Sequence, residues 1–563
     1  MRVENTVLGV QEVRNPSGLV ASNGNFFLFS AQQITSSWEG LYFFDSETVS
    51  AHKFLHAVLP QTPSSRLVAT SQAVFRSSES FSEKMFFQES TWMYEARGEG
   101  GVEFFLDARE ANDYDTQGRF HTITALGRFI FRIDTKDESF FLRSNTPLQE
   151  LDEWVEHSTS FDASRGQGSS WWSHKRIRFF CSGVLRVAIA RSYEELVRVD
   201  WGVVLSERSD TFFLVSSQLE ELTVSTSFGP AVLAGFPWFT QVWSRDEAIA
   251  LGGLFVQERF AVAKEILLRQ VLRVGEDGRI ANRTPGAALG CADGVGWVFT
   301  RLHELVVKQP GLFSQEELRV CYDQLCLSLT RLQKNYFRDG LVFSAAQETW
   351  MDTEGFTGDT REGFCIEIQA LTLRMFSAAE FFSSLLGEPR GFWSSQQQEL
   401  RVRVREEFFV DEKLCDQAGV VLARPNAFIA AYVYPQLLSV GEWRGVFSWL
   451  IDRLWLSWGG FATIDVDNEL FCLEHAGVSD VSYHRGDSWY WLNALAGVVL
   501  SSHEQFRVYA QEVVSSCERE LSCLGVVGRL SEISSASEQV AFGCFSQAWS
   551  ASMLLELLSC LEE

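Results

Sequence analysis

The chain has 563 residues, and its 48 Lys and Arg against 73 Asp and Glu give a formal net charge of −25. At about 150 residues per domain this length predicts two to four domains. A hydrophobic fraction of 46% with 21% charged residues is typical of a globular chain and excludes a disordered one. An acidic surface repels phosphate backbones and anionic lipid headgroups, so neither nucleic acid nor a membrane surface is expected as a partner. No run of eighteen apolar residues occurs, which excludes a spanning helix.

The cysteines and the amino terminus both favour a cytoplasmic location. The eleven cysteines fall between Cys181 and Cys560 without any CxxC pair, so neither a disulfide framework nor a zinc ribbon is expected. Reduced thiols in a cytoplasmic protein are the simplest interpretation. Residues 1–18 show no basic stretch followed by an apolar one, and therefore predict no export signal.

Up to about residue 205 the apolar residues follow the period of β-strands. Short aromatic or β-branched runs are separated by Ser, Gly, Asn or charged turn residues. The runs are 25–32, 40–49, 102–109, 128–134, 139–144, 176–183 and 184–191. Many short strands without helical segments between them predict an N-terminal antiparallel β-sandwich-like domain over residues 1–205.

From about residue 240 the apolar period becomes helical. In the stretch 316–337, for example, Leu318, Cys321 and Leu325 recur at three- and four-residue steps. Similar patterns cover 245–274, 364–386, 396–409, 427–455, 488–522 and 546–562. About a dozen helices predict a large all-α domain over residues 238–563, and paired helices would be consistent with a toroid. Residues 206–237 are expected to connect the two halves.

Common nucleotide-binding and hydrolase motifs are missing from the sequence, whereas carboxylates and arginines recur in Trp- and Gly-rich turns. There is no Walker loop, GxGxxG after a strand, HExxH or GxSxG. In WSRD at 243–246, Arg245 and Asp246 follow Trp243 directly. One interpretation is a helix start, with Asp246 stabilised by the helix dipole. The other is a sugar site, with Arg245 as donor and Asp246 as acceptor for adjacent hydroxyls above the Trp ring.

Two further carboxylates stand in segments of different character. Asp352 lies among Trp350, Met351 and Phe356, an apolar setting that predicts a raised carboxyl pKa. Glu532 precedes the last predicted helix. Taken alone, each of these carboxylates is more often structural than catalytic.

Taken together, the motifs resemble the amylo-α-1,6-glucosidase domain of glycogen debranching enzymes. The motifs are WSRD (243–246), ANR…ADGVGW (281–297), TWMD (349–352), TREGFCIEIQAL (360–371), RPNAF (424–428), YHRGDSW (483–489) and SEI…SQAWS (531–550). Their order and spacing match that family across about 230–563, and the first half resembles the N-terminal domain of the bacterial and archaeal forms more loosely. WSRD and the SE…WS ending also resemble glucoamylases, which share the (α/α)6 toroid.

The resemblance implies an inverting α-glucosidase with Asp352 as general acid and Glu532 as general base. Such a pair stands about 6.5–9.5 Å apart. The sequence neighbours agree in direction, because apolar residues surround Asp352 whereas Ser531, Ser534 and Ser535 would donate to a Glu532 anion. Asp487 is the rival candidate for the base, with Glu538 behind it.

The same resemblance places other residues around the substrate. Trp243, Arg245, Asp246 and Trp350 would line the terminal-glucose subsite. Asp293 with Trp297, Arg361 with Glu367, His484 and Asp487 fall on positions that bind sugar or hold the acid loop. The alternative for these is a buried ion pair or a hydrogen-bonded histidine. No cofactor or metal is implied, because two carboxyl groups suffice for the reaction.

The leading hypothesis for function is hydrolysis of the single α-1,6-linked glucosyl stub on glycogen or a limit dextrin, with release of glucose. No β/α-barrel pattern is present, so a separate glucanotransferase or phosphorylase is expected to act first. One alternative is a glucoamylase- or isomaltase-like exo-α-glucosidase on short α-glucans. A non-catalytic glucan-binding protein is another, and the presence of both Asp352 and Glu532 counts against it.

Overall fold

The computed structural model describes residues 18–30, 34–61, 66–70, 72–135, 138–205, 208–285 and 290–562. Residues 1–17, part of the segment predicted to lack an export signal, lie outside these ranges. A strand-rich first half and a helical second half follow one another along the chain, as the sequence periods predict. No helix in the described part of the chain combines the length and apolar composition that crossing a bilayer would require.

The first half is built almost entirely of strands. Its elements are β1 Gly18–Ser22, β2 Asn25–Phe29, β3 Gly40–Asp45, β4 Ser50–Pro60, β5 Arg66–Ala69, β6 Ala73–Ser77, β7 Phe81–Gln88, β8 Thr91–Glu110, β9 Thr122–Gly127, β10 Ile130–Asp134, β11 Ser139–Ser144, β12 Leu148–Ser158, α1 Ser160–Ser164, β13 Ser170–Ala190 and α2 Tyr193–Val197. Within the described residues these thirteen strands form one sheet, in the order β1-β2-β3-β4-β8-β13-β11-β10-β9, with β12 on β13 and β5-β6-β7 joined to β8.

Every pairing within this sheet is antiparallel, which confirms that part of the prediction. The two strands predicted over 176–183 and 184–191 are a single strand, because β13 pairs with β8 without a break from Ile177 to Ile189. Gly183, with φ +92°, continues the ladder opposite Gly98 and so does not act as a turn. One face of the sheet buries an aromatic core around Phe27, Phe54 and Trp92.

Helices and very short strands make up the second half. The helices are α3 Thr211–Leu222, α4 Ser244–Val256, α5 Phe260–Val271, α6 Gly294–Lys308, α7 Gln315–Asn335, α8 Ile366–Leu386, α9 Phe392–Phe408, α10 Asn426–Val433, η1 Pro435–Leu437, α11 Val440–Leu454, η2 Gly477–Ser479, α12 Tyr490–Ser501, η3 Glu504–Phe506, α13 Arg507–Arg519, η4 Glu520–Leu524 and α14 Ala548–Glu562. The strands are β14 Thr223–Thr226, β15 Gly229–Val232, β16 Gly235–Phe236, β17 Val242–Trp243, β18 Arg283–Thr284, β19 Phe337–Arg338, β20 Leu341–Val342, β21 Phe409–Val410, β22 Lys413–Leu414, β23 Trp455–Leu456, β24 Gly460–Phe461, β25 Ser488–Trp489, β26 Ile533–Ser534, β27 Ala541–Phe542 and β28 Ser546–Gln547.

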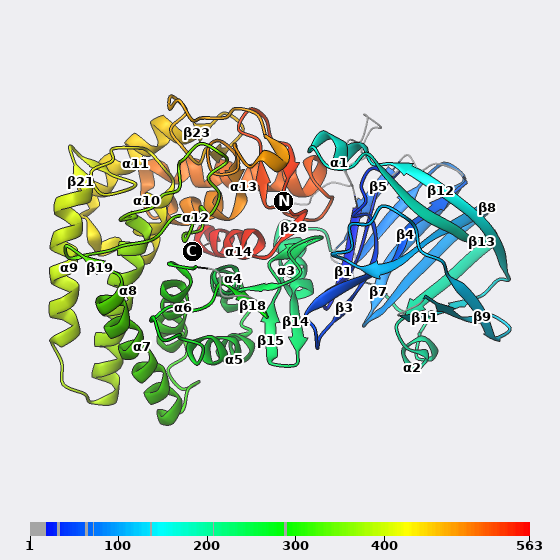
Figure 1. Cartoon of the computed structure of the whole chain (residues 1–563), viewed down its shortest axis with the longest axis horizontal. Coiled ribbons are helices and arrows are strands. Elements are labelled where there is room, and N and C mark those ends of the chain that lie inside the picture. Colours follow the sequence, from blue (N-terminus) through cyan, green and yellow to red (C-terminus); the bar gives the residue numbers. More distant parts are fainter. Residues whose placement is uncertain are drawn as a thin grey trace.

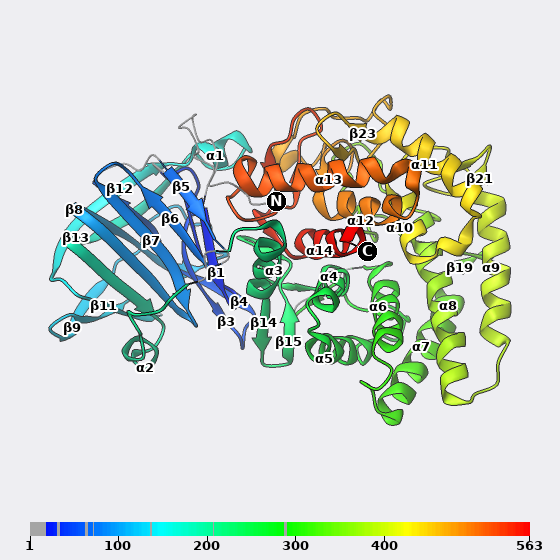
Figure 2. The same ribbon diagram turned by 180° about the vertical axis from the view of Figure 1, so that it is seen from behind.

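Alternate helices of this half contact one another in sequence order. Helix α4 contacts α6, α6 contacts α8, α8 contacts α10, α10 contacts α12, α12 contacts α14, and α14 returns to α4. The circuit is therefore closed by the last helix of the chain, which lies in the middle of the helical half in both views (Figures 1 and 2). Short strands and loops join these helices and carry most of the predicted site motifs.

Two stretches differ from the expected helical pattern. The periodicity over 427–455 is interrupted, since Pro435 follows α10 and cannot continue its hydrogen bonds, and α11 begins anew at Val440 with a Ser439 capping box. The expected connector 206–237 contains helix α3, whose first turn is capped by Asp210. Residues 206–207 lie outside the described ranges.

The two halves share a core. One continuous cluster of buried side chains includes Leu19, Phe26 and Tyr42 from the sheet together with residues of α3, α4 and α14. Phe26 stacks on Phe236 of β16 at 4.6 Å between ring centroids. Helix α3 and the β14–β15 hairpin lie between the sheet and the remaining helices (Figures 1 and 2). The strand-rich half is thus packed against the helical half rather than tethered to it.

Candidate active site

A cavity of about 310 Å³ opens among the loops of the helical half, a size at the lower end of the range for small-ligand pockets. Six residues predicted for the site line it: Trp243, Arg245, Asp246, Trp350, Asp352 and Glu532. The two carboxylates assigned to acid and base, 180 positions apart in sequence, therefore face one common space.

Asp352 lies in the loop between β20 and α8 and contacts two cationic or ionisable groups. Arg245 Nη2 donates to its Oδ2 at 3.3 Å, and His484 Nε2 lies 3.5 Å from its Oδ1. Burial alone would raise the pKa of Asp352, but His484 and Arg245 outweigh it, and the pKa is lowered below its ordinary value. The predicted rise in this pKa was wrong. Of the three apolar neighbours, Trp350 and Met351 are buried, whereas Phe356 is 89% exposed. In the free site Asp352 is an anion at neutral pH.

Glu532 is held at the start of a small three-stranded sheet in which β26 pairs with β25 and β27. Its backbone N donates to Cys544 O at 2.8 Å, and Cys544 N returns a hydrogen bond of 2.8 Å to Oε2. The Tyr483 hydroxyl donates to Oε1. A Cβ at Gly543 would lie 2.3 Å from Oε2, so this close approach of carboxylate and backbone requires glycine there.

The pKa of Glu532 is shifted in the direction opposite to the prediction. Desolvation raises its pKa to about 7, against the lowering effect of Tyr483 and Cys544. The predicted serine donors bond elsewhere: Ser531 donates to Glu520, and Ser535 to Leu473 O. The expectation that these serine hydroxyls stabilise the Glu532 anion was therefore wrong; the hydroxyl that donates to it is that of Tyr483.

Arg245 and Asp246 occupy the first turn of α4, beside the cavity. Arg245 Nη1 donates to Asp293 Oδ1 at 3.5 Å, and Arg245 Nε lies 3.9 Å from Asp246 Oδ2. Desolvation raises the pKa of Asp246 to about 7, with the charges of Glu532 and Asp352 adding to the shift and Arg245 opposing it. One guanidinium thus lies among three carboxylates, Asp246, Asp293 and Asp352, of which Asp246 has a pKa near neutral pH.

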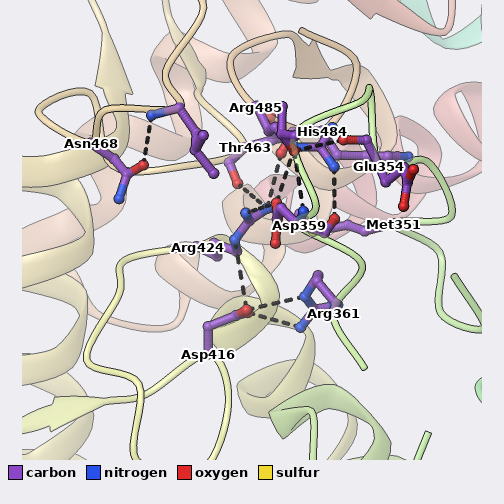
Figure 3. A network of polar contacts seen from close by, with 12 residues as sticks. Met351, Glu354, Asp359, Arg361, Asp416, Arg424, Thr463, Asn468, His484 and Arg485 are labelled. Carbon is purple, nitrogen blue, oxygen red and sulfur yellow. Dashed lines mark hydrogen bonds and ion pairs between the residues drawn. The ribbon is translucent and has the colours of Figure 1, made fainter. Parts of the chain in front are cut away.

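A buried network of ion pairs fixes the loop that carries Asp352 (Figure 3). Arg485 donates to Thr353 O at 2.6 Å and to Asp359 O at 2.8 Å, which fastens the loop at both sides of its turn. Arg424 Nη2 donates to Asp359 Oδ2 at 2.6 Å and its Nη1 to His484 O at 2.9 Å. Despite desolvation, these guanidinium groups lower the pKa of Asp359. The loop position is therefore set by charge-assisted bonds.

Arg361 and Glu367 form an ion pair behind the same loop. Arg361 donates to Glu367, with Nη2 at 3.1 Å from Oε2, and to Asp416 Oδ1 at 2.9 Å. Asn426 Nδ2 donates to the same Asp416 oxygen at 2.7 Å and accepts from Trp350 Nε1 through Oδ1 at 2.7 Å. These contacts orient the cavity wall rather than reach into the cavity.

The remaining predicted residues also lie outside the cavity lining. Asp293 contacts Arg245 from behind, and Trp297 packs 6.0 Å from the ring of Tyr432. Asp487, the rival base, is fully buried and its Oδ2 accepts from Ser482 Oγ and lies 2.8 Å from His475 Nδ1. The second rival, Glu538, is exposed in the β26–β27 turn.

Several cavity residues were not found from the sequence. Among them are Arg165, Trp238, His475, Asp480 and Tyr483. Tyr483 adjoins His484 within the YHRGDSW motif, which was the available signal. Arg165 belongs to the strand-rich half and had none, since only folding brings that half to the cavity. Among the described residues no group of three or more His, Cys, Asp or Glu side chains is arranged to hold a metal ion.

The cavity thus combines a carboxylate kept ionised by His484 and Arg245 with a carboxyl group whose pKa is raised to about 7 by burial. Two carboxyl groups whose pKa values are shifted apart, around one Trp-lined cavity, are an arrangement suited to glycoside hydrolysis. The comparison with protein families agrees: the amylo-α-1,6-glucosidase family model matches residues 208–556. The chain belongs to the amylo-α-1,6-glucosidase family and is a glycoside hydrolase.

Comparison with solved structures shows the fold. A bacterial glucoamylase in complex with acarbose matches 99% of this chain and 96% of its own length with a TM-score of 0.65 at 10% identity, so the chain has a glucoamylase-like fold. A mannosylglycerate hydrolase from Thermus thermophilus in complex with glucose matches 62% of this chain and 99% of its own, with a TM-score of 0.48 and 13% identity. A comparison with curated proteins gives no match.

Proposed function

We propose that the protein is an inverting α-1,6-glucosidase that removes the single glucosyl stub of glycogen or a limit dextrin as free glucose. The observation that carries the proposal is that Asp352 and Glu532 line one cavity beside Arg245 and Asp246. Membership of the amylo-α-1,6-glucosidase family supports the linkage. The reaction as proposed requires no cofactor or metal, because proton transfer between the carboxyl groups, the leaving oxygen and water is sufficient.

In this proposal the terminal glucose lies against the start of α4. Arg245 donates to its hydroxyl groups and Asp246 accepts from them, while Trp243 and Trp350 form an apolar wall of this subsite. Asp352 gives its proton to the leaving oxygen, and Glu532 takes a proton from the water that attacks the anomeric carbon from the opposite side. Asp293, Trp297, Arg361, Glu367, His484 and Asp487 act as positioning residues around this wall.

For Asp352 to act as the general acid, its pKa must rise when substrate binds. Asp352 is ionised because Arg245 and His484 stabilise its anion, and a general acid must be protonated. When glucose hydroxyl groups engage Arg245, its contact with Asp352 weakens and the pKa of Asp352 rises. Glu532, whose pKa in the free site is about 7, can then lose its proton to Asp352 and act as the base.

A second assignment exchanges the two roles, and one observation favours it. In the free site Glu532 is the carboxyl group with the raised pKa, as expected of an acid, and Asp352 is the anion. Variants assayed with substrates of different leaving groups separate the two assignments, as described in the Discussion.

The wider architecture follows from the same proposal. We propose that the closed circuit α4, α6, α8, α10, α12 and α14 is the inner ring of an (α/α)6 toroid over residues 238–563, preceded by a connector, 206–237, and an N-terminal domain, 1–205. The enzyme would work in the cytoplasm on branched α-glucan after a separate phosphorylase or glucanotransferase has shortened the branches.

Product analysis tests the proposal. The pure protein is incubated with a phosphorylase limit dextrin that a transferase has treated, with maltotriose and with isomaltose. Fast glucose release from the dextrin is expected, and NMR should detect β-glucose before mutarotation. Dominant release from maltotriose would instead indicate a glucoamylase-like exo-α-glucosidase, and initial α-glucose would contradict inversion. Binding of glucan without any hydrolysis would indicate a non-catalytic binding protein.

A further inference from the structure

The strand-rich half contributes a charged side chain to the cavity. Arg165 follows α1, lies between β12 and β13 in the chain, and lines the cavity together with Glu532 and Asp480. Its guanidinium lies 4.7 Å from the ring centroid of Trp238, another lining residue, and 5.6 Å from that of Phe161. A cation over two aromatic faces is held in place without using its hydrogen-bond donors.

Both halves of the molecule fix the turn that carries Arg165. Asp162, which is buried, accepts from Ser36 Oγ at 2.6 Å and from Ser37 N at 2.7 Å. On the other side, Phe161 packs 5.4 Å from the ring of Phe545, and Val478 N donates to the carbonyl oxygen of Arg165 at 3.1 Å. The position of the guanidinium is therefore set by the fixed turn and by its contacts with the two aromatic rings, and not by an ion pair.

One donor of the Arg165 guanidinium is unsatisfied. Its Nε is buried and has no hydrogen-bond partner, and within the described ranges Arg165 makes no ion pair. Desolvation raises the pKa of both Glu532 and Asp480, and the charge of Arg165 partly opposes that rise. Arg245, by contrast, is engaged by Asp293 and Asp352. A buried N–H donor without an acceptor, such as Nε of Arg165, is costly unless a ligand supplies one.

We propose that Arg165 binds the part of the glucan that leaves, so that the N-terminal domain forms one wall of the leaving-group subsite. The inference rests on the proposed function, which places the terminal glucose against Arg245 and Asp246 at the start of α4. Arg165 is half-exposed and its neighbour Asp480 is exposed, so this wall lies toward the mouth. The sugar joined to the terminal glucose must extend toward that open side. There the guanidinium donates to hydroxyl oxygens while Trp238 offers an apolar ring for stacking.

The test compares substrates with and without a leaving sugar. Arg165→Gln and Arg165→Lys are assayed on the transferase-treated limit dextrin, isomaltose and maltotriose, and on α-glucosyl fluoride, whose leaving group makes no sugar contact. For Arg165→Gln, kcat/KM on the best sugar substrate should fall about 10-fold to 100-fold, the loss of a hydrogen bond from a charged donor, mostly through KM. Its kcat/KM on α-glucosyl fluoride and the inhibition constant of glucose should change less than about threefold. Arg165→Lys should recover part of the loss.

The matched control is Arg97→Ala, an arginine of the same half whose side chain is 66% exposed and paired with Glu95. It should leave all substrates unchanged. Equal losses on dextrin and fluoride would overturn the proposal, because Arg165 would then act on the terminal glucose or on folding. The absence of any loss on either substrate would also overturn it. If the wild-type enzyme prefers maltotriose, the α-1,6 assignment fails while the ratio of maltotriose to fluoride still tests Arg165.

Discussion

Arg245 Nη2 lies 3.3 Å from Asp352 Oδ2, a contact that joins the start of α4 to a loop 107 positions later in the chain. The same guanidinium lies 3.5 Å from Asp293 and 3.9 Å from Asp246. Arg245 therefore sets the charge of the cavity before any sugar enters. A substrate hydroxyl that accepts from it competes directly with the carboxylate proposed to protonate the leaving oxygen.

Substitution of the two carboxylates should separate acid from base. Asp352→Asn is expected to lower kcat on limit dextrin by about 10²–10⁴-fold. It should cost far less on α-glucosyl fluoride, since fluoride leaves without a proton. Glu532→Gln should lose activity on both substrates, because water is then not activated, while glucan binding by either variant is retained. The measurement is steady-state kinetics with equilibrium binding of glucan.

The opposite pattern would assign the acid role to Glu532. In that case Asp352→Asn would lose its activity on α-glucosyl fluoride, whereas Glu532→Gln would keep it. Asp487→Asn serves as a comparison, since Asp487 is buried behind His475. Turnover near wild type in Glu532→Gln together with loss on both substrates in Asp487→Asn would make Asp487 the base.

The pH profile of kcat/KM should fall on the alkaline side near pH 7. The pKa of Glu532 is about 7, so above that pH both carboxyl groups are anions and the pair has no proton to donate, whichever group acts as acid. Asp246 also has a pKa of about 7, and Asp246→Asn is therefore the control. The residual activity of this variant should still fall at alkaline pH. The fall should lie at lower pH, because loss of the neighbouring negative charge of Asp246 lowers the pKa of Glu532. A profile that stays flat to pH 9 would contradict the raised pKa.

Stability should fall with pH because of the same carboxyl group. Glu532 has a folded-state pKa of about 7 against an ordinary 4.5, so its favourable contribution is complete below pH 4.5 and is lost as the pH rises through 7. The full difference is roughly 3 kcal/mol. Denaturant unfolding of Glu532→Gln should show a smaller loss between pH 5 and pH 8 than the wild type. Glu538→Gln, in the exposed turn of the same hairpin, should follow the wild type. Equal pH dependence in all three proteins would refute the assignment.

Gly543 should be required for activity beyond its effect on the backbone. Gly543→Ala places a Cβ 2.3 Å from Glu532 Oε2 at φ +68°, which displaces the carboxylate. A shift of about 1 Å in a catalytic group costs on the order of 10²-fold in rate. Gly419→Ala is the control, since Gly419 has φ +74° and nothing within 4 Å of its added Cβ. Both variants should lose about 1 kcal/mol of stability, and only Gly543→Ala should lose kcat. Retained kcat in Gly543→Ala would show that Glu532 does not need this position.

The local sequence pattern was sufficient to predict most helices and strands, but not those whose extent depends on packing against another element. Helix α7 follows from its apolar period and the Ser314 capping box, which lie within one stretch of chain. Strand β13 was predicted as two strands, because a twenty-one-residue strand is stabilised by its partner β8 and not by its own residues. Helix α3 was missed although Asp210 caps it, since its buried face depends on α14.

By itself the sequence determined the two-part fold class and the family, because periodicity and ordered motifs are properties of the chain alone. Only the tertiary structure decided how the carboxyl groups are charged. Ion pairing and desolvation depend on distances in space, so His484 and Arg245 hold Asp352 as an anion while burial raises the pKa of Glu532 to about 7. It also brought Arg165 to the cavity, from a half of the chain in which no motif marked it.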